Sequence, residues 1–462
     1  MVNKWPTIRL GDFCLKIGSG ATPKGGSNVY DTTGTTYLIR SQNIYNDGFN
    51  SNGLVYINDE AAIKLKNVMV QKNDILLNIT GDSVARVCLA PEHFLPARVN
   101  QHVAIIRPDP KHFDPRFIRY FLSSPYVQQF LLTLSSAGAT RNALTKGMIG
   151  NLEVPKPPLD IQNAIANNLE CFDSKILVSQ QINQTLEQIS QTLFKSWFVD
   201  FDPVIDNALE AGNPIPDSLQ KRAKLRQKVR NSSEFKPLSN EIRALFPAEF
   251  EETELGWVPK GWIIDNIQNI ALLNPNSWSS KNSPKNIEYV DLSNAKDGSI
   301  LSTEFYLFDD APSRARRILN KHDIIFGLVR PANRSFAYVH KEGLTGSTGF
   351  AVIRAKKSYH KNHIYSCLTD RKNIEEFTRI ADGGAYPAIR PDDISNLKII
   401  LPSELILKNF DELVSNFREK MIVNLSSNHY LTQLRDTLLP KLISGELSLE
   451  ELPETTTETE YA

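Results

Sequence analysis

Residues 183–193 read NQTLEQISQTL, and residues 428–438 read NHYLTQLRDTL. Identical side chains recur between the two stretches at an offset of 245 residues, as in the pair Asn183 and Asn428 and the pair Leu186 and Leu431. Further matches at this offset extend upstream without a gap. Self-similarity at a period near half the chain predicts two copies of one architecture.

Both stretches lie within longer segments in which apolar side chains recur at steps of three and four residues, at 165–197 and 410–442. This spacing predicts two long amphipathic helices. Neither helix can bury so narrow an apolar stripe alone, so we expect the two to pack against each other as an antiparallel, coiled-coil-like pair. The alternative is that each helix packs on a globular domain of its own.

The segments upstream of each helix have a different pattern. Short β-branched runs such as 36–39, 74–79, 323–326 and 350–353 alternate with Gly, Asn and Asp, which is typical of strands in loop-rich domains. We therefore predict an α+β fold with two similar domains separated by the helix pair, related by a pseudo-two-fold repeat. The predicted divisions are 1–158 for the first domain, 159–199 for the first helix, 200–254 for a connector, 255–402 for the second domain, 403–445 for the second helix and 446–462 for an acidic, disordered tail.

The chain has 462 residues and a formal net charge of zero, but the charge is unevenly distributed. Residues 1–150 carry +6 and residues 255–402 carry +5, whereas residues 151–254 carry −5 and residues 403–462 carry −6. The four cysteines lie far apart without metal-ligand spacing, so we expect them to be reduced and the chain to be cytoplasmic. No apolar run approaches the ~20 residues that cross a bilayer.

Common catalytic motifs are not found. Residues 20–27 have the glycine spacing of a P-loop, but Gly26 occupies the place of the phosphate-binding lysine. His360 and His363 have no nearby cysteine and are interpreted as surface histidines rather than metal ligands. The basic run 221–230 is interpreted as a solvated helix face.

Two basic, loop-rich domains joined to long helices suit a protein that holds an extended polyanion at two points, and double-stranded DNA is the natural candidate. Polar and basic residues on loops can contact phosphates and base edges. The candidates in the first domain are Lys24, Arg40, Ser41, Gln42, Asn43, Asn100, Gln101, Thr140, Arg141, Asn142 and Lys146. The candidates in the second domain are Arg314, Arg316, Arg317, Arg330, Asn333, Arg334, Tyr386 and Arg390.

Four segments carry a resemblance to a known family. SWFVDFDP at 196–203 and LLPKLISGEL at 438–447 end the two helices, VPKPPLDIQ at 154–162 enters the first helix, and VPKGW at 258–262 opens the second half. In these segments, and over essentially the whole chain except the acidic tail, the sequence resembles the specificity subunit of type I restriction-modification systems, which act in phage defence.

The resemblance implies two target-recognition domains that each read one half of a bipartite, asymmetric DNA site, with the helix pair fixing the spacing. It implies no catalytic residue and no cofactor in this chain. Methyltransferase (modification) subunits with S-adenosylmethionine and motor-nuclease (restriction) subunits with ATP and Mg²⁺ are the implied partners. The candidate partner-binding residues are Trp197, Phe198, Phe201, Leu439, Pro440 and Leu442.

Two alternatives of other classes remain open at this point. A structural coiled-coil adaptor with basic protein-binding domains predicts no steep salt dependence of duplex binding. A self-contained DNA methyltransferase predicts that the purified chain binds S-adenosylmethionine. The second copy also departs from the family pattern, because residues 401–406 replace the PPLDIQ entry to the helix and GGAYP at 383–387 replaces GATR at 138–141.

Overall fold

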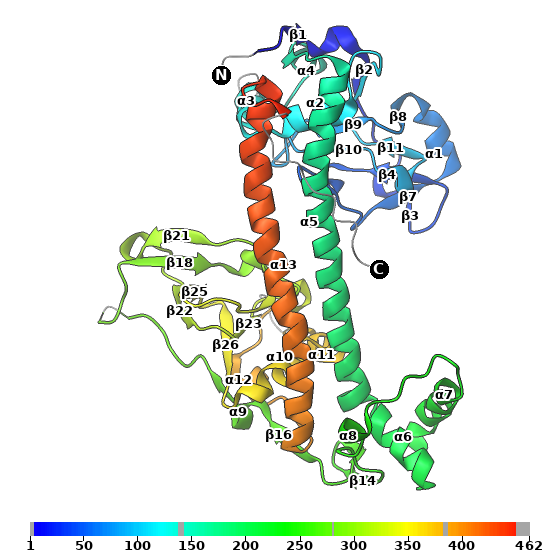
Figure 1. Cartoon of the computed structure of the whole chain (residues 1–462), viewed down its shortest axis with the longest axis vertical. Coiled ribbons are helices and arrows are strands. Elements are labelled where there is room, and N and C mark those ends of the chain that lie inside the picture. The colour runs from blue at the N-terminus through cyan, green and yellow to red at the C-terminus, as the bar shows by residue number, and fades with distance from the viewer. Residues whose placement is uncertain (1–3, 137–142, 280, 382–386, 450–462) are drawn as a thin grey trace. The chain divides into compact units, whose positions relative to one another are not determined.

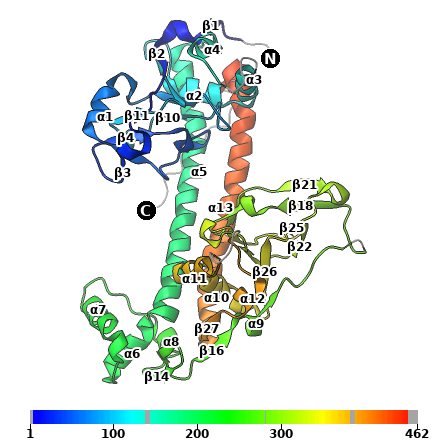
Figure 2. The ribbon, with the colours of Figure 1, turned by 180° about the vertical axis from the view of Figure 1, so that it is seen from behind.

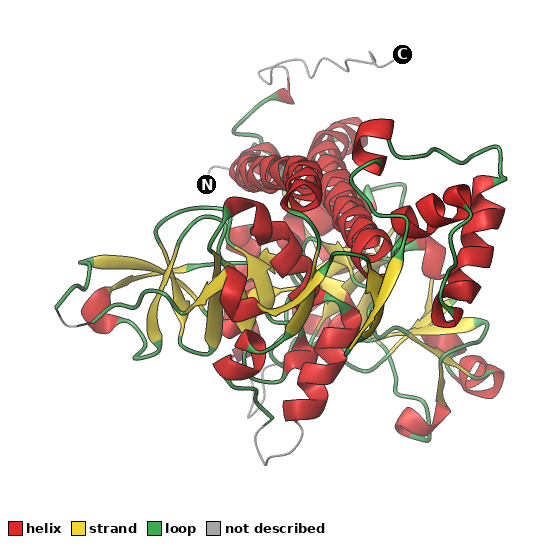
Figure 3. Cartoon of the chain, turned by 90° about the horizontal axis from the view of Figure 1, so that it is seen from below, coloured by secondary structure: helices red, strands yellow, loops and turns green. Residues whose placement is uncertain are grey.

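The computed structural model describes residues 4–136, 143–279, 281–381 and 387–449. The chain divides into two units. Unit 1 comprises Met1–Gln180 with Leu425–Ala462, and unit 2 comprises Gln181–Asn424. The chain combines strands and helices (Figure 3), and both kinds of element occur in each unit, which confirms the predicted α+β class.

Unit 1 is built mainly from short strands. They are β1 (Thr7–Arg9), β2 (Cys14–Ser19), β3 (Tyr30–Asp31), β4 (Thr36–Ile39), β5 (Ile44–Tyr45), β6 (Gly48–Phe49), β7 (Val55–Ile57), β8 (Met69–Val70), β9 (Ile75–Asn78), β10 (Val87–Leu89), β11 (Ala97–Val99), β12 (Val103–Pro108) and β13 (Glu153–Pro155). The helices upstream of residue 159 are α1 (Asp59–Lys64), α2 (Pro115–Ser123), α3 (Pro125–Ser136) and α4 (Lys146–Gly150).

Two sheets organise this unit. One has the order β10-β9-β12-β2 and the other has the order β3-β7-β4-β11-β8. Strands β4 and β11 are parallel, with Ile39 opposite Val99, so both strands end at the same edge of their sheet. The loops that follow these two strands are therefore neighbours.

Unit 2 repeats this arrangement. Its strands are β14 (Phe250–Thr253), β15 (Gly256–Pro259), β16 (Ile263–Asn266), β17 (Ala271–Leu273), β18 (Asn286–Val290), β19 (Ala295–Lys296), β20 (Ser299–Ile300), β21 (Glu304–Leu307), β22 (Ala315–Leu319), β23 (Ile324–Gly327), β24 (Phe336–Tyr338), β25 (Leu344–Ser347), β26 (Phe350–Ala355) and β27 (Lys398–Leu401). Its shorter helices are α6 (Asp202–Ala211), α7 (Gln220–Arg230), α8 (Asn240–Arg243), α9 (Ile267–Ile270), α10 (Lys361–Thr369), α11 (Arg371–Ala381) and α12 (Pro391–Ser395).

The sheets of unit 2 match those of unit 1. The order β17-β26-β23-β24 corresponds to β2-β12-β9-β10, and the order β21-β18-β25-β22 corresponds to β7-β4-β11-β8. Strands β18 and β25 are parallel, as β4 and β11 are. The repeat seen in the sequence therefore extends to strand topology, although few residues of the strands are identical.

Two long helices complete both units. Helix α5 spans Leu159–Phe194 and continues as a π-helical turn at Lys195–Val199, and α13 spans Glu404–Ser444. The two helices begin 245 residues apart, at Leu159 and Glu404, which is the offset of the repeat. The altered sequence before α13 therefore does not shift the residue at which that helix begins. The predicted long helices are confirmed.

The two helices pair in antiparallel fashion inside each unit (Figures 1 and 2). In unit 1, Asp173 of α5 forms an ion pair with Arg435 of α13. In unit 2, Asn183 of α5 donates a hydrogen bond to the carbonyl of Met421, at 3.1 Å, and accepts one from Asn424. Asparagines that bond across a helix pair fix its register, because an offset would leave their amides unpaired.

Two sequence interpretations are wrong or incomplete. His360 and His363 are both buried rather than at the surface, because α10 packs into the core with nearly all of its residues. In α7, the lysines are exposed as predicted, but the three arginines, Arg222, Arg226 and Arg230, form ion pairs with Asp202, Asp206 and Glu210 of α6. Of the predicted acidic tail, residues 450–462 lie outside the described residues. Within the described part of the chain, no helix combines the length and apolar character that crossing a membrane requires.

Candidate nucleic-acid interface

In unit 1, the loops that follow β4, β9 and β11 meet at one edge of the sheets. The backbone NH of Asn100 donates to the carbonyl of Ile39, at 3.1 Å, which joins the loop after β11 to the loop after β4. The side chain of Asn78, at the end of β9, donates to the carbonyl of Ser41, at 2.9 Å, and to the hydroxyl of Ser83, at 3.1 Å. Three loops that are distant in sequence therefore form one surface.

A fourth segment joins this surface after the undescribed residues 137–142. Thr80 forms an antiparallel bridge with Ala143, and the NH of Leu144 donates to the carbonyl of Ile79, at 2.9 Å. The hydroxyl of Thr80 also lies 2.6 Å from Nδ1 of His102. Lys146 is exposed at the start of α4, close in sequence to this bridge. The predicted contacts Thr140, Arg141 and Asn142 lie outside the described residues.

Lys24 lies on the loop after β2, and the start of this loop is bonded to the end of β11. The NH of Ala21 donates to the carbonyl of Val99, at 3.1 Å. Gly20 allows this approach, because a Cβ at that position would lie 2.1 Å from the carbonyl oxygen of Val99. Lys24 itself is exposed. The glycine is thus required by a close passage of two backbones and not by phosphate binding.

Two of the predicted contacts in unit 1 have a structural role instead. Asn43 is fully buried, and its side chain donates to the carbonyls of Asn50 and Asn52. Asn100 is only 8% exposed, and its side-chain oxygen accepts a hydrogen bond from the NH of His102. Their polar atoms shape the loops, so Asn43 and Asn100 are weaker candidates for DNA contact than the sequence suggests.

The neighbours of those two residues remain available. Gln42 and Gln101 are exposed, and Ser41 is half-buried. Arg40 is half-buried above the ring of Tyr30, with one guanidinium nitrogen donating to the carbonyl of Gly53. The structure thus brings Ser41, Gln42 and Gln101 to one edge and turns Arg40 partly toward its own loop.

In unit 2, the corresponding loop follows β23. Val329 forms an antiparallel bridge with Ala388, as Thr80 does with Ala143, and the NH of Arg330 donates to the carbonyl of Pro387, at 2.9 Å. Arg330 and Arg334 both have a left-handed backbone, with φ of 49° and 56°. Non-glycine residues in this conformation are uncommon and concentrate at functional sites.

Arg330, Asn333 and Arg390 are exposed candidates on this side of unit 2. The segment that carries Arg390 is joined to the loop after β23, since the NH of Ile389 donates to the carbonyl of Leu328, at 2.9 Å. Arg330 and Arg390 therefore lie on adjoining segments. Tyr386 lies outside the described residues.

The other predicted arginines of unit 2 have partners in the chain. Arg314 forms an ion pair with Asp291, and its hydrogen bond to Tyr289 contributes most to raising the pKa of its guanidinium. Arg334 forms an ion pair with Asp297. The guanidinium of Arg316 lies above the ring of Phe308, at 4.7 Å from its centroid. The guanidinium of Arg317 donates from NH1 to the hydroxyl of Ser277, at 3.2 Å. Of this group only Arg314 keeps a largely exposed side chain, so Arg316, Arg317 and Arg334 are weaker candidates than the sequence suggests.

The sequence analysis missed the loop at 80–86. It corresponds to 329–335 at the offset of 249 that relates Asp74 to Asp323, and Ala85 has a left-handed backbone at the place equivalent to Arg334. Asp82 is exposed at its tip. Extending the 249-residue offset beyond Ile75 would have identified this loop, although the two loops share almost no residues.

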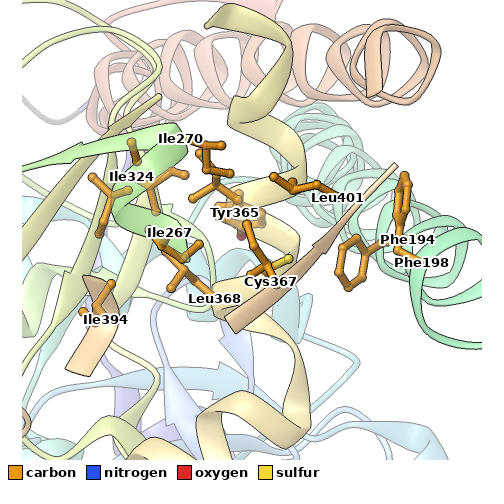
Figure 4. Packing of buried hydrophobic residues seen from close by; sticks show 14 of the residues in the cluster. Phe194, Phe198, Ile267, Ile270, Ile324, Tyr365, Cys367, Leu368, Ile394 and Leu401 are labelled. Carbon is orange, nitrogen blue, oxygen red and sulfur yellow. The ribbon is translucent and has the colours of Figure 1, made fainter. Parts of the chain in front are cut away.

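Five of the six predicted partner-binding residues lie in hydrophobic cores. Trp197, Phe198 and Phe201 belong to the core of unit 2, and Leu439 and Leu442 belong to a core of unit 1. Pro440 is half-buried within α13. Figure 4 shows Phe198 beside Phe194 in the unit 2 core. Contact of the five core side chains with another protein would require these cores to open, so they are weaker candidates for a docking surface than the sequence suggests, whereas Pro440 stays a prediction.

Comparison with known proteins agrees with this architecture. Residues 3–188 match the family model described as the type I restriction modification DNA specificity domain. The chain is 26% identical to the type I restriction enzyme HindI specificity subunit of Haemophilus influenzae over 96% of this chain and 100% of that one. It is 26% identical to the MjaIX specificity subunit of Methanocaldococcus jannaschii over 73% of this chain and 70% of that one.

A solved structure shares the fold. The type I restriction-modification system S subunit from M. genitalium aligns with a TM-score of 0.51 at 15% identity, covering 95% of this chain and 96% of that one. The family model, the relatives and the repeated domains with their long helices agree with one another. Residues 3–188 thus match a type I restriction modification DNA specificity domain, and over nearly its whole length the chain is similar to a specificity subunit of a type I restriction enzyme.

Proposed function

We propose that this chain reads a bipartite, asymmetric double-stranded DNA site, with one half-site bound by the strand-end loops of each unit. The observation that carries the proposal is that the internal repeat builds the same surface twice from different residues. In unit 1 the bridge between Thr80 and Ala143 supports this surface, and in unit 2 the bridge between Val329 and Ala388 does so.

The differences between the two surfaces support an asymmetric site. Arg40 precedes the turn after β4, whereas Asp291 precedes the equivalent turn after β18. Gly81 lies in the loop after β9, whereas Arg330 occupies the equivalent place in unit 2. Side chains of different charge and hydrogen-bonding pattern select different base pairs in the major groove.

The distribution of charge supports DNA as the ligand. The two domains carry the positive blocks of the sequence, +6 over residues 1–150 and +5 over residues 255–402. Contacts of lysine and arginine with phosphates supply affinity, and exposed side chains such as Gln42, Gln101 and Arg330 are suited to bases.

We further propose that α5 and α13 act as the spacer between half-sites and that the chemistry belongs to partners. Modification subunits would bind S-adenosylmethionine and methylate adenine, and restriction subunits would use ATP and Mg²⁺. In this assembly the present chain contributes placement and needs no cofactor of its own.

The decisive experiment is a map of genomic methyladenine in the source organism with the gene intact and with it deleted. We expect one bipartite motif to disappear on deletion and to return when the intact gene is supplied. An unchanged methylation map would refute the assignment. Steep loss of duplex binding with rising salt by the purified assembly would separate DNA reading from a purely protein-binding adaptor.

A further inference from the structure

A polar cluster in unit 1 surrounds Asp173 of α5. Its carboxylate accepts hydrogen bonds from the hydroxyl of Tyr120, at 2.8 Å, and from NH1 of Arg119, at 2.9 Å. It also accepts one from NH1 of Arg435 of α13, at 2.6 Å. We call these four residues the Asp173 cluster. A carboxylate of α5 is thus held between its own domain and the opposite helix.

A polar cluster in unit 2 surrounds Arg418 of α13. Its guanidinium carbon lies 3.9 Å from the ring centroid of Tyr365 and 4.6 Å from that of Tyr338. Its Nε donates to the side-chain oxygen of Asn362, at 2.6 Å, and its NH1 lies 3.7 Å from a carboxylate oxygen of Glu187 of α5. We call these five residues the Arg418 cluster.

The two clusters occupy equivalent places with opposite charge. The offset of 245 converts Tyr120 into Tyr365 and Asp173 into Arg418. A tyrosine at this position therefore binds a negative group in one unit and a positive group in the other. Its hydroxyl donates to a carboxylate in unit 1, and its ring face attracts a guanidinium in unit 2. The charged partner on the opposite helix also has the opposite sign, Arg435 in unit 1 and Glu187 in unit 2, although these two are not repeat-equivalent: the offset relates Arg435 to Ser190, three residues after Glu187.

This inversion has a consequence for helix pairing. In a pair of two α5 helices with the same antiparallel arrangement, the second copy would take the place of α13. Asp173 of that copy would then stand where Arg418 stands, opposite Glu187, and Ser190 would stand where Arg435 stands, opposite Asp173. If α13 met a second copy of α13, Arg418 would face Arg435. The exposed fractions of these side chains are 22% for Asp173, 24% for Glu187, 6% for Arg418 and 15% for Arg435, so water would screen the like charges poorly.

Side-chain size at the helix ends also favours the pairing of α5 with α13 over the pairing of either helix with a second copy of itself. The offset of 245 relates Phe194, Trp197 and Phe198 of the α5 end to Leu439, Leu442 and Ile443 of α13. The aromatic set packs against Phe410 and His363 in unit 2, whereas the aliphatic set packs with Ile165 and Leu169 in unit 1. Exchanging the sets would overfill one core and leave the other underfilled.

We propose that α5 and α13 are selected to pair with each other and against a second copy of themselves, and that the Asp173 and Arg418 clusters are the main determinants of this choice. The opposite charges favour the unlike pair, and the like charges disfavour both alternatives. The selection keeps two different domains on one helix pair. It depends only on contacts within the chain and stands independently of the DNA that the chain reads.

The test uses the full chain with a site-specific protease sequence inserted after Ser233, in the exposed connector loop. The folded protein is cleaved, unfolded in urea and refolded, and native mass spectrometry counts the pairs formed by the N-terminal and C-terminal pieces. Random association gives about half unlike pairs. We expect the wild-type pieces to refold almost entirely as unlike pairs, and a random mixture would overturn the selection.

A charge exchange then tests the clusters themselves. With Glu187→Arg and Arg435→Glu together, the unlike pair would set two carboxylates against each other at Asp173 and two guanidinium groups against each other at Arg418, whereas both like pairs would gain opposite charges. We expect like pairs to rise several-fold at the expense of unlike pairs. The control combines Lys175→Glu with Glu419→Arg, which exchanges charges at exposed positions of the same helices and should leave the wild-type distribution unchanged.

A loss of helical circular dichroism would show that the double variant fails to fold. In that case Arg435→Glu alone carries the test, because it turns the pairing of two C-terminal pieces from repulsive to attractive and places a carboxylate opposite Asp173 in the unlike pair. Retention of the wild-type distribution in the folded charge variant would overturn the role of the clusters.

Discussion

The guanidinium of Arg107 donates two hydrogen bonds to the buried carboxylate of Asp74, at 2.6 and 2.8 Å, and Arg354 binds Asp323 in the same way in unit 2, at 2.7 and 2.8 Å. Both carboxylates also accept a backbone NH three residues earlier, from Gln71 and from Asn320. The repeat has thus kept one ion pair in each domain. In both, it joins a tight turn to the neighbouring strand.

Removal of this carboxylate should destabilise one unit. Asp74→Asn leaves Arg107 without its counter-charge, and losing one partner of a buried pair costs about 3 kcal/mol. We expect urea to unfold unit 1 at a clearly lower concentration while the transition of unit 2 stays in place. Glu92→Gln, which breaks the exposed pair with Lys72, is the control and should cost at most about 1 kcal/mol. Equal shifts in both variants would contradict the structural role of Asp74.

Arg330 should affect only the half-site read by unit 2. If it contacts a base, Arg330→Ala should weaken binding by about 1–3 kcal/mol and relax selectivity at one position of that half-site. Titration of duplexes that carry each base at each position would measure this. Arg379→Ala is the matched control, because Arg379 lies on α11 in an exposed ion pair with Glu376. A uniform loss across all sequences would make Arg330 a phosphate contact instead.

The spacing between half-sites should follow helix length. Seven residues inserted both after Gln180 and after Asn424 fall at the boundary between the units and leave the contacts of each unit intact. Seven helical residues add about 10 Å, which corresponds to about 3 base pairs of DNA. We expect the methylation motif to keep both half-sites and to gain a longer spacer. An unchanged spacer in an active assembly would exclude the helices as the ruler.

His363 should make unit 2 sensitive to acid. Burial against Phe194 and Phe198 lowers the pKa of its imidazole to about 3, so the folded state holds it neutral while the unfolded state takes up a proton below about pH 6.5. The contribution of neutral His363 to the free energy of unfolding is therefore complete above pH 6.5. It is lost as the pH falls toward 3, at up to about 1.4 kcal/mol per pH unit.

The variant His363→Leu tests this pH dependence. Leucine does not titrate, so unfolding free energies measured in urea should fall less steeply with acid than in the wild type. Other titrating groups are common to both proteins and cancel in the difference. Parallel profiles for the two proteins between pH 6.5 and pH 4 would contradict the assignment to His363.

The long helices could be predicted because their apolar positions repeat with the helical period over more than thirty residues. Their starts at Leu159 and Glu404 agree with the expected boundaries to within one residue. The surfaces against which the ends of these helices pack could not be predicted. Trp197 and Leu442 look like exposed anchors in the sequence, and only the folded domains show that each fills a core.

The site was predictable only as a set of loops. Gln42 and Asn43 are adjacent and equally polar, yet one is exposed and the other is buried beneath residues 50–52. Gln101 and Asn100 differ in the same way. Which of two neighbouring amides faces solvent depends on backbone carbonyls supplied from elsewhere in the chain, and local sequence does not encode their position.

A strand pair closes each domain just before its long helix, and this closure has an evolutionary consequence. Strand β1 pairs with β13 just before α5, and β16 pairs with β27 just before α13, so the chain enters and leaves each domain at one place. Insertions between these strands do not alter the helix that follows. The offset between copies accordingly drifts from 257 at Trp5 and Trp262 to 245 at the helices. Each domain is a closed insert that can diverge, or be replaced whole, without shifting a single residue of the helix pair.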